Sequence, residues 1–321
     1  MRQWSELENE MVSLERLLEY SKVDTDPERP DPAAVPKLWP EDGHIEFRNV
    51  SLKYNPHDPP VLKNLNFTIQ PREKIGIVGR TGAGKSSTIT ALFQLYPIEG
   101  TILIDGVDTT KLPLEDVRSK ISIIPQEPVL FSGNMRKNLD PFEEYDDETL
   151  WNALDQVELR EVVAELPDGL QSYVSEGGAN FSVGQRQLVC LARALIRNNK
   201  ILVMDEATAN VDPYTDALIQ NTIREKFADC TVLTIAHRLH TVMDSDRILV
   251  MNAGSVEEFE HPFVLLGDKK GILYSLVQTT GKTTAANLES IAREVGVWAS
   301  RGLFLMEGLL QSFMRRGQSE I

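Results

Sequence analysis

Residues 79–86 form a glycine-rich string that could hold a phosphate group. The string has the pattern G-x-x-x-x-G-K-S and ends in Lys85 and Ser86. Glycines allow backbone conformations that a Cβ would forbid, so successive N–H groups can point at one anion. Lys85 supplies a positive charge for the terminal phosphates, and the Ser86 hydroxyl can ligate Mg²⁺. We therefore predict a Mg-ATP loop whose contacts are Gly79, Thr81, Gly82, Ala83, Gly84, Lys85, Ser86 and Ser87.

An apolar run, Ile201–Met204, ends in two adjacent carboxylates, Asp205 and Glu206. Phosphate-loop enzymes hold an Asp near Mg²⁺, and a buried strand that ends in a carboxylate can deliver it there. Neighbouring strand residues point to opposite faces, but the chain bends at a strand end, so both side chains can face one site. We assign Asp205 to the metal shell and Glu206 to the general base that polarises the attacking water. A solvated acidic strand end is the alternative.

The segment Ser182–Gln185 predicts the start of a helix. Ser182 and Gln185 have the S-x-x-Q spacing of a capping box, in which each side chain bonds the backbone N–H of the other residue. A helix N-terminus with a hydroxyl and a glycine for close approach, here Gly184, can also bind an anion. One ATP hardly needs a second phosphate site, which suggests that the two sites face different nucleotides. A plain helix start is the alternative.

The residues between these motifs alternate between strand and helix patterns. Short β-branched or aromatic runs predict strands at 45–47, 50–54, 61–69, 74–78, 101–104, 121–124, 201–204, 231–235 and 247–251. Helices are expected at 88–95, 146–166 and 183–197. This alternation favours an α/β fold with a largely parallel sheet that is covered on both faces. The strand at 74–78 leads directly into the glycine-rich loop, and a helix should follow the loop.

Changes in composition divide the chain into four segments. Residues 1–22 predict an amphipathic helix, which either packs on its own domain or continues out of a part that this chain lacks. Five prolines make 23–43 an extended linker before a main domain at 44–280. The tail, 281–321, contains Val297–Leu310, which predicts a loosely docked helix or a membrane-surface or partner helix. The last three residues, Ser319–Glu320–Ile321, fit a weak PDZ-type contact.

The composition narrows the classes of function. A net charge of −15 argues against a nucleic-acid surface, which needs clustered Lys and Arg. The sequence has no run of about 18 apolar residues, so we predict no transmembrane helix, and its acidic N-terminus does not resemble a signal peptide. Its two cysteines, Cys190 and Cys230, show neither a disulfide framework nor metal spacing, which fits a reducing, cytosolic setting.

Over about residues 40–280, the ordered motifs resemble the nucleotide-binding domain of an ATP-binding cassette (ABC) transporter. The resemblance implies a phosphate-loop core with an antiparallel β-subdomain and an α-helical subdomain. It implies catalytic roles for Lys85, Glu206 and His237, the last at the γ-phosphate. It also implies that Tyr54 stacks on adenine and that Gln126 senses the Mg²⁺. The implied metal ligands are Ser86, Gln126 and Asp205.

Other positions of the family motifs would face a partner domain. By resemblance, Ser182, Gly184 and Gln185 contact the partner's ATP, and Asp212 belongs to a loop at the dimer contact. Residues 180–194 and 206–212 look most like the second cassette of the C subfamily. Val183 stands where a second Gly is usual, and Phe181 where Leu is usual, which suggests two unequal ATP sites.

The resemblance implies an ATPase that powers the export of organic anions or xenobiotics. Because Glu206 is retained, this chain would supply the hydrolytic half-site, at the cytoplasmic face of a membrane and, we expect, of the plasma membrane. Its partners would be transmembrane domains and a second cassette, either the first cassette of the same transporter or a second copy. Residues 1–22 then resemble the segment that leaves the last transmembrane helix.

Two other functions stay open. One is a soluble cassette ATPase of translation or DNA repair, although no long insertion separates Lys85 from Ser182 as repair proteins require. The other is a regulatory module that binds ATP without hydrolysing it, which the retention of Glu206 and His237 disfavours.

Overall fold

A computed structural model describes residues 2–22, 33–205, 211–236 and 238–294. Glu206, His237, Val297–Leu310 and Ser319–Ile321 lie outside these ranges, so the roles expected of them stay predictions. Among the helices in these ranges, none combines the length and the apolar character needed to cross a bilayer.

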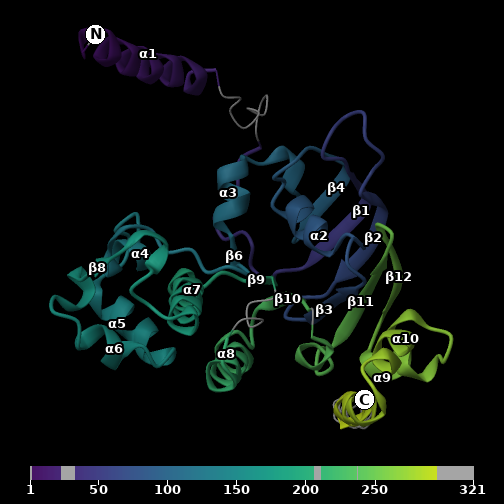
Figure 1. Cartoon of the computed structure of the whole chain (residues 1–321). Helices are drawn as coiled ribbons and strands as arrows, with labels where there is room; N and C mark the ends of the chain where they lie inside the picture. The colour runs from purple at the N-terminus through teal and green to yellow at the C-terminus, as the bar shows by residue number, and fades with distance from the viewer. Residues whose placement is uncertain (1, 23–32, 206–210, 237, 295–321) are drawn as a thin grey trace, which may run out of the picture.

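Six strands form the central sheet, in the order β12-β11-β3-β10-β9-β6 (Figure 1). Every neighbouring pair is parallel except β11 with β12. Alternate residues of β9 face two separate cores, Leu202 and Met204 one, Ile201 and Val203 the other, so both faces of the sheet are covered. The predicted α/β class is therefore confirmed. The strands are β3 (Lys74–Gly79), β6 (Ile121–Ile124), β9 (Ile201–Asp205), β10 (Thr231–Ile235), β11 (Arg247–Asn252) and β12 (Ser255–Glu260).

A second, antiparallel sheet shares a core with the central one, in the order β2-β1-β4-β5. The prediction of two strands at 45–47 and 50–54 was wrong, because one strand, β1, spans Ile45–Leu52. Asn49, at φ 51°, shifts the register between Phe47 and Val50 and so breaks the alternation without ending the strand. The other members are β2 (Leu62–Ile69), β4 (Ile98–Ile104) and β5 (Val107–Asp108), followed by η1 (Thr109–Lys111) and α3 (Leu114–Ser119).

A helical lobe lies beside the central sheet, on the left of Figure 1. The helix predicted at 183–197 is confirmed as α7 (Val183–Arg197). The single helix predicted at 146–166 was wrong, because Glu158, at φ 54°, separates α5 (Asp147–Gln156) from α6 (Arg160–Ala164). The lobe also contains α4 (Met135–Leu139), β7 (Gly133–Asn134), β8 (Tyr173–Val174), η2 (Gly169–Gln171) and η3 (Glu176–Gly178), and α8 (Pro213–Lys226) packs against α7.

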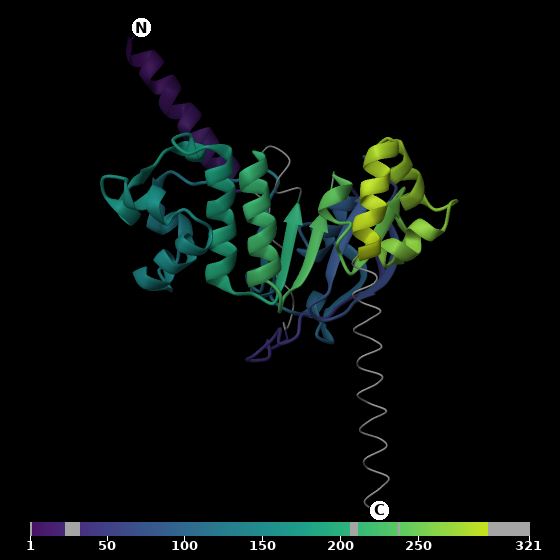
Figure 2. The same cartoon turned by 90° about the horizontal axis from the view of Figure 1, so that it is seen from below.

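The C-terminal part of the described chain covers the other side of the molecule (Figure 2). It comprises η4 (Leu239–Thr241), α9 (Pro262–Gly267), α10 (Ile272–Thr279) and a helical segment at 282–294. Ala285, Leu288 and Ala292 of that segment are buried in one core with Val242 and Leu273. The start of the predicted tail therefore packs on the domain.

The N-terminal helix α1 (Arg2–Tyr20) stands apart from the rest of the chain in Figure 1. Its side chains from Met11 to Tyr20 are all exposed, so this part of the apolar stripe does not pack on the domain. The end of the predicted linker behaves differently. Trp39 is 4% exposed, and its Nε1–H donates to the Ile104 carbonyl oxygen at 2.8 Å.

Candidate nucleotide-binding site

The carboxyl ends of four parallel strands bring the predicted phosphate loop and the predicted metal ligands to one edge of the sheet. Ile235 at the end of β10 pairs with Ile77 of β3 on one side and with Asp205 of β9 on the other. Neighbouring strands lie about 4.8 Å apart, so the Asp205 backbone lies roughly 10 Å across the sheet from β3. β6 ends at Ile124, beside β9, and Gln126 follows two residues later.

The glycine-rich loop connects β3 to α2 (Lys85–Leu92), which begins earlier than the helix predicted at 88–95. Gly79 and Gly84 have φ angles of 154° and 104°, which favour glycine. A Cβ at Gly79 would collide with the Met251 carbonyl oxygen, and one at Gly84 would lie 2.9 Å from Leu62 Cδ2. The loop is therefore pressed between β11 and β2, and only glycine fits at these two positions.

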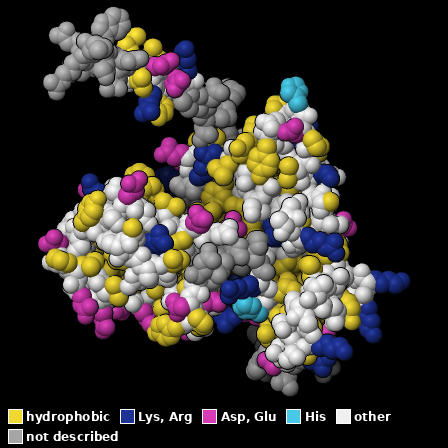
Figure 3. All heavy atoms as spheres, viewed as in Figure 1, with side chains coloured by type: hydrophobic (Ala, Val, Ile, Leu, Met, Phe, Trp, Pro, Cys, Tyr) yellow, Lys and Arg dark blue, Asp and Glu magenta, His cyan; other side chains and the backbone are white. Residues whose placement is uncertain are grey.

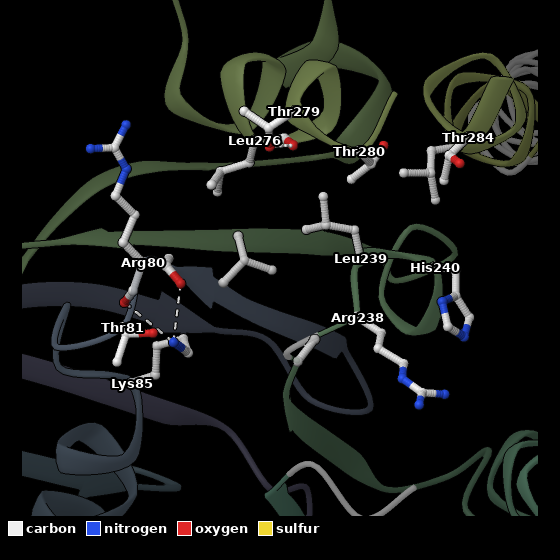
Figure 4. Close-up of a pocket in the computed structure, with 14 residues that line it drawn as sticks. Arg80, Thr81, Lys85, Arg238, Leu239, His240, Leu276, Thr279, Thr280 and Thr284 are labelled. Atoms are coloured by element: carbon white, nitrogen blue, oxygen red, sulfur yellow. Dashed lines mark hydrogen bonds between the residues drawn. The ribbon is translucent and has the colours of Figure 1, made fainter. Parts of the chain in front are cut away.

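Lys85 and Ser86 lie at the N-terminus of α2. Lys85 is 7% exposed, and its Nζ donates to the carbonyl oxygens of Gly79 at 3.0 Å and Arg80 at 3.3 Å (Figure 4). The Lys85 ammonium group is thus hydrogen-bonded to the backbone of the same loop that is expected to bind the phosphates. Ser86 is exposed, so its hydroxyl is accessible to a metal ion. Backbone N–H groups of the first helical turn have no partner within a helix and attract anions.

Tyr54 lies close to the same helix. Its hydroxyl forms a 3.0 Å hydrogen bond with Ser87 Oγ, and its ring packs edge-on against Tyr96 with centroids 4.8 Å apart. Tyr54 is 39% exposed, so part of the ring can accept a stacked base. Tyr96 was not predicted here, because no motif spacing pointed to it.

A pocket of about 610 Å³ opens beside the phosphate loop (Figure 4). Gly79, Thr81 and Lys85 line one side of it, and Arg238 and His240 line another. The neighbours of His237 in sequence, Ala236 and Arg238, therefore border the space next to Lys85. α10 and the segment 282–294 complete the wall with Leu276, Thr279, Thr280, Thr284 and Leu288.

Charge is distributed unevenly around this pocket. Lys85, Arg80 and Arg238 give the pocket a cationic lining, which suits a polyanion. Acidic side chains gather over the helical lobe, as the magenta atoms at the left of Figure 3 show. The strongly negative net charge of the chain is therefore compatible with a cationic nucleotide site.

The residues predicted to contact a partner's ATP lie elsewhere, at the N-terminus of α7. Ser182 and Gln185 form the expected capping box, with bonds of 3.1 Å from the Gln185 N–H to Ser182 Oγ and 2.9 Å from the Ser182 N–H to Gln185 Oε1. Gly184 is buried against α8, where a Cβ would lie 3.2 Å from Thr215 Oγ1. These residues do not line the pocket that contains Lys85.

Asp212 caps α8 beside them. Its Oδ1 accepts from the N–H groups of Tyr214 and Thr215, both at 3.1 Å, and its Oδ2 accepts from the Thr215 hydroxyl at 2.7 Å. The hydrogen bonds from Thr215 hold the pKa of the Asp212 carboxyl below its usual range. Tyr214 also donates its hydroxyl to Glu158 Oε2 at 2.7 Å, which ties this turn to the helical lobe.

These residues fit a bound Mg-ATP. The loop offers N–H donors and a buried ammonium to phosphates, and Ser86 with Asp205 offers oxygen ligands of the kind that Mg²⁺ prefers. Gln126 is exposed and could approach the same edge. Lys85, Ser86 and Asp205 already stood out by their motifs and Gln126 by the family resemblance, whereas the helical wall from Leu276 to Leu288 did not.

Comparisons with known proteins agree with this geometry. The family model described as "ABC transporter" matches residues 62–209. The chain is 59% identical over 300 residues to the "Probable multidrug resistance-associated protein lethal(2)03659" of Drosophila melanogaster. It is 55% identical over 295 residues to "ATP-binding cassette sub-family C member 4" of Homo sapiens. In both cases the match covers 92% of this chain and 22% of the relative, so the chain spans about a fifth of these relatives.

A solved structure gives the same result. The "Structure of a bacterial Atm1-family ABC exporter with ATP bound" superposes with a TM-score of 0.74 at 31% identity, over 85% of this chain and 47% of that one. The sequence-based resemblance to the C subfamily, and within it to multidrug resistance-associated protein 4, is confirmed.

Proposed function

The chain belongs to the ABC transporter family as an ATP-binding cassette of the C subfamily, and we propose that it works as the second of two cassettes that drive an exporter. The observation that carries this proposal is the separation of its two phosphate-binding surfaces. The loop with Lys85 and the helix start at Ser182 lie in different parts of the domain, and they do not share a pocket. Each surface therefore needs a complementary one from another cassette.

In the proposed reaction, this chain binds the phosphates of ATP and activates a water molecule. Bound Mg²⁺ would supply charge neutralisation at the phosphates, with Ser86, Asp205 and Gln126 as its protein ligands. Lys85 holds the terminal phosphates from within the loop, and the exposed face of Tyr54 accepts the adenine ring. Glu206, next to Asp205, would take the proton of the attacking water.

His237 would hold the same water or the γ-phosphate. Its neighbour Arg238 lines the pocket beside Lys85, which supports a position near the phosphates. The partner's counterparts of Ser182, Gly184 and Gln185 would complete the site from the opposite side. Asp212, at the first turn of α8, would meet the partner cassette.

The surface next to Gln126 is suited to contact with transmembrane domains. Three apolar side chains are exposed there, Ile123 at 42%, Val129 at 51% and Phe131 at 68%. They line a groove of about 230 Å³ with Pro125 and Arg197. Apolar side chains gathered around a groove are typical of a binding surface. We infer that ATP-dependent movement reaches the membrane through this groove, at the cytoplasmic face of the plasma membrane.

The cargo belongs to the proposal as well. The names of the relatives refer to multidrug resistance and to export, and we infer organic anions or xenobiotics as the cargo of the complete transporter. Residues of this chain would not touch the cargo, because the nucleotide domain acts through the membrane part. The Ser319–Ile321 contact with a PDZ-type domain stays a prediction.

The hydrolytic role is tested with Glu206→Gln. We expect the variant to bind a fluorescent ATP analogue as tightly as the wild type and to hydrolyse ATP about 10²–10⁴-fold more slowly, the usual contribution of a positioned base. Wild-type turnover no faster than that of the variant, with equal binding, would refute hydrolysis and favour a regulatory module. Absence of ATP binding by the wild type would refute the nucleotide site itself.

A further inference from the structure

The loop that follows Gln126 exposes two apolar side chains around a buried anchor. Val129 and Phe131 are exposed, whereas Leu130 between them is 1% exposed and belongs to the core of the helical lobe. The loop therefore cannot move relative to this lobe without withdrawing Leu130 from that core. Two polar side chains, the buried Asn138 and the partly buried Arg193, strengthen the attachment.

Asn138 of α4 brackets the backbone of Phe131. It is 3% exposed, its Oδ1 accepts from the Phe131 N–H at 2.9 Å, and its Nδ2 donates to the Phe131 carbonyl oxygen at 2.8 Å. A third bond, from Nδ2 to the Asn134 carbonyl oxygen at 3.0 Å, fixes the amide itself. Both backbone groups of Phe131 are thus held by one side chain.

Arg193 of α7 reaches the same place from the other side. Its Nε donates to the Asn138 carbonyl oxygen at 2.5 Å, and its two terminal nitrogens donate to Asn138 Oδ1 at 2.9 Å and to the Val129 carbonyl oxygen at 2.8 Å. The guanidinium fork is therefore directed at the loop and at the residue that brackets it.

Arg193 carries a charge at a position where no carboxylate of the described residues pairs with it. Burial lowers the pKa of its guanidinium, and within the described ranges the structure contains no ion pair between Arg193 and a carboxylate. Arg193 is only partly exposed, and taking a charge partly out of water without a counter-ion is costly, so an apolar residue of similar size often suits a fold as well or better. The fork geometry at the loop gives a reason for keeping an arginine here.

A second contact joins α7 to the beginning of the loop. Gln187 is 1% exposed, and its Nε2 donates to the Pro125 carbonyl oxygen at 3.1 Å, one residue before Gln126. Gln187 and Arg193 thus hold both ends of the segment 125–131 to one helix. The same helix begins at Ser182, the expected contact with a partner's ATP.

We propose that Arg193, acting with Asn138, is a positioning residue that fixes the Val129–Phe131 loop to α7, so that a displacement of α7 carries this exposed surface with it. Attachment of the loop follows from the contacts alone. Transmission from ATP to the loop rests on the proposed function.

Hydrogen–deuterium exchange of the complete chain tests the attachment. Arg193→Met should speed exchange of the Phe131 amide at least about tenfold, because charge-assisted bonds that hold its acceptor are lost. Arg193→Lys, which keeps the charge but lacks the fork, should give an intermediate rate and is informative if the Met variant does not fold. Lys137→Met is the matched control, since Lys137 is an exposed cation of α4 beside Asn138 and does not line the groove, and it should leave the rate within twofold. An unchanged Phe131 rate in both Arg193 variants overturns the proposal.

The same measurement with a non-hydrolysable ATP analogue and Mg²⁺ tests transmission. In the wild type, both the 79–86 and the 127–134 peptides should become more protected. In the Arg193 variants, protection of 79–86 should remain while the response of 127–134 is lost, a split that a merely structural role would not produce. A protected 79–86 peptide with no response of 127–134 in the wild type overturns transmission alone. If 79–86 itself stays unprotected, the proposed function fails.

Discussion

Gly184→Ala tests how closely the start of α7 is packed against α8. In an ordinary helix this change stabilises by about 1 kcal/mol, because alanine has the higher helix propensity. Here the new Cβ would lie 3.2 Å from Thr215 Oγ1 and 3.3 Å from Thr215 Cγ2, closer than a comfortable contact. Thr215 cannot easily turn aside, because its hydroxyl and its N–H both donate to Asp212.

The two effects have opposite signs, and the crowding should be the larger. Overpacking of a rigid contact costs about 1–3 kcal/mol. After subtraction of the propensity gain, we expect Gly184→Ala to lower the free energy of unfolding by about 1 kcal/mol. Because Thr215 anchors Asp212, the crowding should also disturb the predicted dimer contact.

Urea denaturation of four variants measures the effect. Gly184→Ala should destabilise the wild type, whereas in a Thr215→Ala background it should be neutral or stabilising, with a coupling of at least about 1 kcal/mol. Gly267→Ala in α9 is the matched control, since nothing lies within 4 Å of a Cβ there, and it should not destabilise. If Gly184→Ala stabilises the wild type as much as the control does, the packing argument is refuted.

Three further predictions concern other sites. Trp39 is a core residue in the segment that was expected to be a linker, so Trp39→Ala should lower the free energy of unfolding, measured by urea denaturation, by about 3–5 kcal/mol. The same change at its exposed neighbour, Leu38→Ala, should lower it by less than about 0.5 kcal/mol. Equal losses in the two variants would contradict this. Tyr54→Phe keeps the ring but loses the hydrogen bond to Ser87, so it should change the affinity for a fluorescent ATP analogue less than about threefold. Tyr54→Ala removes the ring and should weaken this affinity about tenfold. Similar losses of affinity in the two variants would exclude stacking. The lowered pKa of Asp212 means that its stabilisation is present above its unfolded pKa of about 3.9 and is lost as pH falls through the lower folded value. The difference in unfolding midpoint between wild type and Asp212→Asn should therefore shrink between about pH 5 and pH 2, and a constant difference would refute this assignment.

Short sequence signals were enough to predict those helices and strands whose ends are marked by capping or turn residues. α7 matched its predicted bounds because Ser182 and Gln185 mark its beginning and Asn198, in a left-handed conformation, ends it. The break at Glu158 and the bulge at Asn49 carry no Gly or Pro, so the sequence pattern continued across both.

The candidate site could be predicted as a set of residues but not as an arrangement. Spacing pointed to Lys85, Ser86 and Asp205 because each belongs to a short motif with its own chemistry. Their proximity depends on the order in which the strands pair, which no local pattern encodes. The prediction for Gly184 was incomplete for the same reason. It covered the approach of an anion but not the packing against Thr215, which belongs to another helix.

The capping box at Ser182 also determines what the start of α7 can offer to a ligand. Four N–H groups at a helix N-terminus have no partner within the helix, and the box uses those of Ser182 and Gln185. In the described part of the chain, the N–H groups of Val183 and Gly184 donate to no protein acceptor, so two donors remain at the positive end of the helix. The cap thus fixes the turn and leaves adjacent donors for an anion. Because α8 covers the Cα of Gly184, a phosphate would have to approach past the side chain of Val183, which is 37% exposed. We therefore predict that this side chain, which stands where the family usually has a glycine, limits the access of a partner's phosphate to this surface.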